Sequence, residues 1–107
     1  AFVLAMTFYP EVQKKAQQEI DDVLGFHRLP EVADMDTLSY VMGVCKEALR
    51  WNPLLPSGLP HVASEDAVVQ GYFIPQGTII FGNAWVLLHD ETDFGPNPDK
   101  FDPERYL

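Results

Sequence analysis

The sequence predicts a mainly α-helical chain with a small β-hairpin or sheet, the α+β class, because helical and strand patterns occupy different parts of it. Residues 10–24 and 39–51 carry apolar side chains at helical spacing. Residues 67–83 instead combine β-branched side chains with proline and glycine, as strands joined by a turn do. No apolar run approaches the roughly 20 residues that span a bilayer.

Composition and charge limit the function classes. The chain has 107 residues, of which 47% are hydrophobic and 21% charged, as in ordinary globular domains. Sixteen acidic residues against seven Lys plus Arg give a net charge of −9, which argues against nucleic-acid binding. Cys45 has no second cysteine to pair with, and no Asn-x-Ser/Thr sequon occurs, so the composition fits a reducing compartment. The apolar start has no basic flank and is not expected to be a signal peptide.

The first helix is expected over residues 10–24. Pro10 suits the first helical position, and Gly25 suits the C-terminal stop. The apolar stripe of this helix consists of Val12, Ala16, Ile20, Val23 and Leu24. Residues 26–36 contain Pro30 and are expected to form a loop with at most a short turn of helix.

The second helix is expected from Ser39 to Trp51, where Asn52-Pro53 ends it. Its apolar stripe consists of Leu38, Val41, Met42, Cys45, Ala48 and Leu49. Cys45 is therefore predicted to be a small buried hydrophobic side chain. Glu47 and Arg50 are three positions apart, so they project from one face of this helix.

The second half is expected to contain turns and one hairpin. Residues 53–60 hold three prolines and a glycine and are predicted to be irregular. Within 67–83, a type I turn at residues 74–77 is predicted to join the strands, with Pro75 and Gly77 at its second and fourth positions. A helical turn is expected at residues 85–89, and the proline-rich tail, residues 90–107, is predicted to be ordered loop.

Three segments in sequence order carry a family resemblance. Residues Lys46–Trp51 resemble the Glu-x-x-Arg helix of the cytochrome P-450 family, and Gly71–Thr78 resembles its Gly-Tyr-x-Ile-Pro-x-Gly-Thr segment. Residues Phe101–Tyr106 are similar to its Phe-x-Pro-Glu-Arg-aromatic signature. The resemblance covers residues 1–107 and implies a partial domain from the C-terminal half of a eukaryotic microsomal, fungal-like member. The implied part runs from the end of the long oxygen-side helix to the meander and lacks the haem-binding cysteine loop.

The resemblance also implies residue roles. Glu47, Arg50 and Arg105 would form a buried structural triad, the alternative being an exposed salt bridge on the helix. His61 would bind a haem propionate, the alternative being a surface histidine after a proline turn. The residues expected to line the substrate pocket, or else to pack as loop core, are Leu54, Leu55, Ser57, Gly58 and Leu59. No catalytic residue and no metal ligand is expected here, because the axial cysteine would lie outside this chain and Cys45 is not its substitute.

The implied parent is a haem-dependent monooxygenase that oxidises a small organic substrate with O2 and electrons from an NADPH-dependent reductase. Its expected location is the cytoplasmic face of the endoplasmic reticulum membrane, with an anchor outside this chain. The chain by itself is expected to be inactive, to bind no haem stably, and to be soluble or aggregated. The main alternative is a small acidic α+β interaction module without a cofactor. A hydrolase centred on His89-Asp90 ranks third, because no nucleophile elbow is recognisable.

Overall fold

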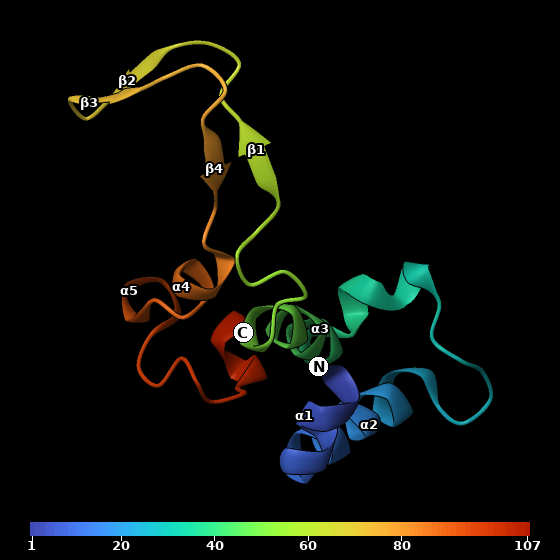
Figure 1. Ribbon diagram of the computed structural model, residues 1–107. Coiled ribbons are helices and arrows are strands. Elements are labelled where there is room, and N and C mark those ends of the chain that lie inside the picture. The colour runs from blue at the N-terminus through green and yellow to red at the C-terminus, as the bar shows by residue number, and fades with distance from the viewer.

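The computed structural model describes all residues, 1–107, and shows a helical body from which a narrow β arm projects (Figure 1). Its principal extents are 58 × 30 × 22 Å, so the molecule is elongated. The first part of the body contains α1 (Phe2–Phe8), α2 (Pro10–Leu24), the 3-10 helix η1 (Val32–Thr37) and α3 (Ser39–Trp51). After the arm, the chain returns to this body through α4 (Ala84–Leu88), α5 (Glu91–Phe94) and the 3-10 helix η2 (Pro103–Tyr106). None of these helices is both long and apolar enough to cross a bilayer.

The predicted boundaries of the two principal helices are confirmed. Pro10 is the first residue of α2, and Gly25, with φ +69, follows its last residue. The N-cap residue of α3, Leu38, has no side-chain acceptor, so its first N–H groups need a partner from another helix. The Glu19 carboxylate on α2 accepts hydrogen bonds from the backbone N–H groups of Tyr40 (2.9 Å) and Val41 (2.8 Å). The Glu19 carboxylate therefore caps the N-terminus of α3 and joins α2 to α3.

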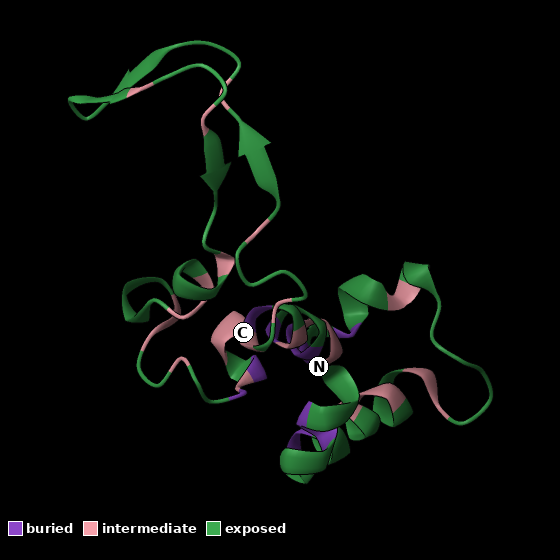
Figure 2. Cartoon of the chain, in the orientation of Figure 1, coloured by how far each residue is buried: buried purple, intermediate pink, exposed green.

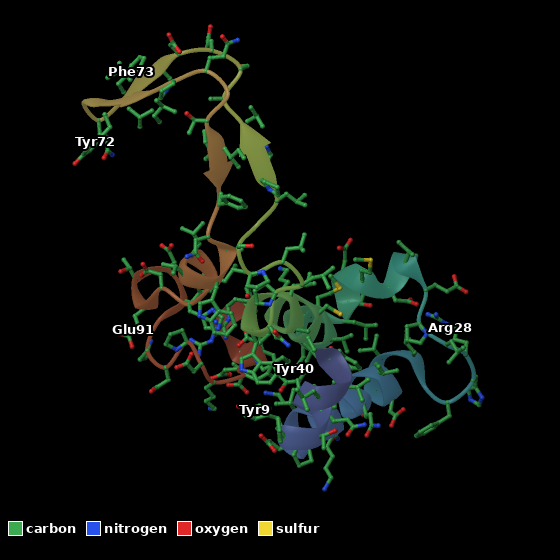
Figure 3. All side chains as sticks on the ribbon, viewed as in Figure 1. Tyr9, Arg28, Tyr40, Tyr72, Phe73 and Glu91 are labelled. Atoms are coloured by element: carbon green, nitrogen blue, oxygen red, sulfur yellow. The ribbon has the colours of Figure 1, made fainter.

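The core forms where the N-terminal helices, α3 and the tail meet, and the arm contributes no buried residue (Figure 2). Its buried hydrophobic residues are Ala5, Met6, Val12, Tyr40, Val44 and Phe101. The ring of Phe101 stacks on Tyr9 at a centroid distance of 5.6 Å and meets Trp51 edge-on at 5.7 Å. Tyr9 and Tyr40 both lie in the helical body, whereas Tyr72 and Phe73 lie at the far end of the arm (Figure 3). The aromatic contacts thus fix the tail against α1, α2 and α3.

The predicted strand pairing is wrong. Strand β2 (Ala67–Val69) pairs antiparallel with β3 (Tyr72–Ile74), and β1 (Pro60–Val62) pairs antiparallel with β4 (Ile79–Phe81). The tight hairpin turn is Gln70-Gly71, whose φ angles of 50° and 86° are those of a type I′ turn, the type that matches strand twist. The chain bends again after Pro75, where the Thr78 N–H donates to the Pro75 carbonyl. Gly77 has φ +85 at the third position of that turn, as type II requires, and the turn connects two different sheets.

The buried face of α3 also differs from the predicted apolar stripe. The buried residues of α3 are Tyr40, Gly43, Val44, Glu47 and Arg50. Cys45, predicted to be buried, is exposed, as is Leu49. Apolar periodicity misplaced this face because it assigns charged side chains to solvent, whereas Glu47 and Arg50 satisfy each other inside.

Two predicted loops contain short helices. The tail holds α5, capped by Asp90 through the Thr92 N–H (2.7 Å), and η2, capped by Asp102 through the Glu104 N–H. In the segment after α2, the Arg28 guanidinium binds both oxygens of Asp34, at 2.6 and 2.7 Å, at the start of η1. This hydrogen-bonded ion pair, together with the Glu31 N–H, lowers the pKa of Asp34 to about 2. The helical turn expected at residues 85–89 is confirmed as α4.

Candidate functional site

A buried carboxylate–guanidinium pair lies on the inner face of α3. The Glu47 side chain is 0% exposed and that of Arg50 is 1% exposed. Arg50 Nε lies 2.7 Å from Glu47 Oε2, and Arg50 Nη2 lies 2.8 Å from Oε1, so the contact is bidentate. The i, i+3 spacing of the helix places the two groups side by side, and the planar guanidinium matches the carboxylate.

Arg50 also holds the segment that follows the arm. Its Nη1 donates to the carbonyl of Leu88 at the end of α4 (2.8 Å), and its Nη2 donates to the carbonyl of Pro98 (2.6 Å). The guanidinium lies 5.5 Å from the ring centroid of Phe94 on α5. Charge-assisted hydrogen bonds in a buried site are stronger than neutral ones, so this single side chain fixes α4 and the tail to α3.

Arg105 completes the cluster in a different way. Its Nε lies 3.5 Å from Glu47 Oε1, which is an ion-pair distance, and it has no hydrogen-bond partner although it is buried. Its Nη1 donates to the carbonyl of Phe94, and its Nη2 donates to that of Asn97 at 2.7 Å. Glu47 Oε1 also accepts the Asp102 N–H at 2.8 Å. The structure thus brings Glu47, Arg50 and Arg105 together, with Arg105 the more weakly coupled cation.

The surrounding groups respond to this buried charge. Burial, reinforced by the Glu47 carboxylate, raises the pKa of the Tyr106 phenol. Lys46 lies over the ring of Tyr106, 5.7 Å from its centroid. A phenol is neutral at physiological pH even without this shift, so Tyr106 places no negative charge next to Glu47.

The predicted pocket residues lie on the loop between α3 and β1. Leu54, Leu55 and Leu59 are all exposed, with Leu54 91% exposed. Leu54 lines an open apolar groove of about 670 Å³, together with Ala1, Phe2, Cys45, Ala48, Leu49, Asn52 and Pro53. Leu55, Ser57, Gly58 and Leu59 do not line that groove.

His61 lies apart from the buried cluster, on the exposed strand β1 opposite Ile80. Its side chain is exposed, so the ring nitrogens are accessible to another group. No group of three or more His, Cys, Asp or Glu side chains lies close enough to hold a metal ion.

Sequence reasoning missed the backbone partners of the buried cluster. The two guanidinium groups donate hydrogen bonds to the backbone carbonyls of Leu88, Phe94, Asn97 and Pro98. No side-chain motif predicts these acceptors. The prolines at 96, 98 and 103 are the available signal, because proline excludes regular hydrogen bonding and leaves nearby carbonyls free. Sequence reasoning also missed Glu19, whose partner helix lies about twenty residues further along the chain.

Two arginines and one glutamate thus form a buried charge cluster that joins α3 to the proline-rich tail. A family model described as Cytochrome P450 matches residues 1–107. The chain therefore belongs to the cytochrome P450 family. This membership displaces the alternatives of an unrelated acidic module and of a hydrolase.

Relatives and solved structures agree with this assignment. The chain is 52% identical over 107 residues to cytochrome P450 monooxygenase claR of Ampulloclitocybe clavipes. It is 51% identical over 106 residues to cytochrome P450 monooxygenase 208 of Postia placenta. It covers 20% of each of these relatives, while they match 100% and 99% of the chain. A zebrafish cytochrome P450 solved with progesterone superposes with a TM-score of 0.91 at 33% identity, over 99% of this chain and 25% of that one.

Proposed function

We propose that the chain is the part of a haem-dependent monooxygenase that holds the tail before the haem loop against α3 and supplies one wall of the substrate pocket. The observation that carries the proposal is the bidentate Glu47–Arg50 pair, fully buried and bonded to carbonyls of α4 and the tail. A buried ion pair is costly unless every partner is satisfied, so its value here lies in fixing one arrangement of these segments. The role is structural, and none of the three charged residues acts on substrate.

The residues present fit one edge of a haem site. His61 offers an accessible ring nitrogen on an exposed strand, which suits a propionate. When bound, thiolate-ligated haem supplies the activation of O2. The thiolate would come from another part of the parent, because Cys45 lies on the outer face of α3 beside Leu49. The present chain contributes orientation and shape to that chemistry.

The substrate proposed is a small, largely apolar organic molecule. Three of the five predicted wall residues are leucines with exposed side chains, Leu54, Leu55 and Leu59. The zebrafish relatives were solved with progesterone and with abiraterone, which are compounds of this general kind. We further propose an NADPH-dependent reductase as electron donor and the cytoplasmic face of the endoplasmic reticulum as location, on the resemblance to microsomal members.

The test uses the full-length parent. Purified protein is expected to contain haem and, after reduction, to give the carbon monoxide spectrum of thiolate-ligated haem. With a fungal NADPH-dependent reductase, it is expected to consume NADPH faster when an apolar substrate is present. Leu55→Ala and Leu59→Ala are expected to keep the haem and change substrate-induced spectral shifts. A parent that binds no haem, or wall variants that bind all substrates as the wild type does, would contradict the proposal.

A further inference from the structure

The loop between α3 and β1 touches the corner between β4 and α4 at two glycines. Gly58 has φ +70, a conformation that glycine adopts freely and other residues rarely do. A Cβ atom at position 58 would overlap the carbonyl oxygen of Gly82 and lie 3.2 Å from its carbonyl carbon. A Cβ atom at position 82, by contrast, would meet nothing within 4 Å. Only position 58 therefore requires glycine for this contact.

A backbone hydrogen bond holds the same two segments together. The Trp85 N–H, near the start of α4, donates to the carbonyl of Pro56 at 2.8 Å. Within the loop, the Gly58 N–H donates to the carbonyl of Leu55 at 2.9 Å and closes a turn. The Gly58–Gly82 contact and the Trp85–Pro56 hydrogen bond both involve backbone atoms. Backbone atoms cannot move aside as the end of a flexible side chain can.

The corner is itself anchored to the buried charge cluster. The Asn83 side chain caps α4 by accepting the Val86 N–H, at 3.2 Å. The last residue of α4, Leu88, accepts a hydrogen bond from Arg50 at 2.8 Å. In Figure 1 the loop after α3 and the chain entering α4 run together at the base of the arm. A short, hydrogen-bonded path thus runs from Arg50 through α4 to the loop.

We propose that Gly58 is a positioning residue. Its close contact with Gly82, together with the Trp85–Pro56 hydrogen bond, fixes the position of the loop between α3 and β1, which carries Leu55 and Leu59, relative to the rest of the pocket. The inference rests on the proposed function, in which this loop forms a wall of the substrate pocket. Gly58 then acts through the placement of Leu55 and Leu59, not through contact with substrate. A misplacement of about 1 Å in a positioning element can cost on the order of a hundred-fold in rate, so a small shift of the wall is measurable.

The experiment compares Gly58→Ala with Gly82→Ala in the full-length parent, with imidazole and 4-phenylimidazole as spectral probes of the haem pocket. Imidazole is small and reports access to the haem, whereas the phenyl ring of the larger probe must also fit against the wall. Gly58→Ala is expected to keep imidazole affinity within about two-fold and to change 4-phenylimidazole affinity by about ten-fold or more, which is about 1.4 kcal/mol. Gly82→Ala is expected to change neither affinity. Gly58→Asn, which tolerates positive φ but adds a Cβ atom, is expected to behave as Gly58→Ala.

Three results would overturn the inference: wild-type affinities in Gly58→Ala, equal effects of Gly58→Ala and Gly82→Ala, or wild-type behaviour of Gly58→Asn. If Gly58→Ala fails to fold, Trp85→Pro compared with Trp85→Ala replaces it. Proline is tolerated in the first turn of a helix and removes the N–H that binds Pro56, so only Trp85→Pro should alter the 4-phenylimidazole affinity selectively. Equal binding by those two variants would also refute the inference. A wild-type parent that takes up no haem at all would identify the proposed function as the part that failed.

Discussion

The sharpest energetic consequence of the structure concerns Arg50→Ala. This change leaves the fully buried Glu47 carboxylate without its bidentate partner, so that the Asp102 N–H and the more distant Arg105 alone offset its charge. Removing one partner of a buried ion pair typically costs about 3–5 kcal/mol. Native proteins are stable by only about 5–15 kcal/mol, so this loss is a large share of the total. The carbonyls of Leu88 and Pro98 also lose a charged donor, which loosens α4 and the tail.

The measurement is urea unfolding of the full-length parent, followed by circular dichroism and by haem absorbance, together with the ratio of haem to protein. Arg50→Ala is expected to lower the unfolding midpoint sharply and to reduce haem content. Arg50→Lys is expected to resemble it, because an ammonium group cannot reproduce the planar fork. Arg28→Ala is the matched control, since Arg28 makes an equally bidentate contact with Asp34 but is 45% exposed. Identical unfolding curves for Arg50→Ala and Arg28→Ala would refute this reasoning.

Variants at three further positions of the parent test other contacts. Arg105→Ala is expected to destabilise less than Arg50→Ala in the same urea assay, because its Nε lies 3.5 Å from Glu47; a larger loss would contradict the geometry. His61→Arg is expected to keep haem, whereas His61→Ala should weaken haem affinity roughly ten- to a hundred-fold in a haem titration. This factor corresponds to the loss of one hydrogen bond to a charged group. Equal haem affinities of His61→Ala and the wild type would make His61 an ordinary surface residue. Glu19→Ala is expected to lower stability by about 1 kcal/mol, as loss of an N-cap does. The control Gln18→Ala, at an exposed position of the same helix, should not lower it, and equal melting temperatures would argue against capping.

The helices were predictable because their signals are local. The proline at position 10, the glycine at position 25 and the spacing of apolar residues fix α2 without reference to the rest of the molecule. Strand pairing was not predictable in this way, because it depends on a φ angle of +50° at Gln70, which no local sequence pattern indicates. The hairpin turn was predicted at the Pro-Gln-Gly segment, residues 75–77, but in the structure this segment connects two different sheets.

The candidate site shows the same division. The resemblance predicted which three charged residues belong together, and the structure places them within ion-pair distance. Apolar periodicity alone misplaced the buried face of α3, because it excludes Glu47 and Arg50 from the interior, although the resemblance had implied a buried triad. Cys45 and Leu49 lie on the exposed face of α3, where they line the same groove as Leu54.

We propose that haem binding by the parent depends on the scaffold that the buried Glu47–Arg50 pair holds. The decisive measurement is the carbon monoxide difference spectrum of the reduced parent, measured per mole of polypeptide for the wild type and for Glu47→Gln. Glutamine keeps the size of the side chain and removes the charge that two arginines neutralise. The wild type is expected to give the thiolate-type spectrum, and Glu47→Gln is expected to lose it. An undiminished thiolate-type spectrum in Glu47→Gln would contradict the proposal.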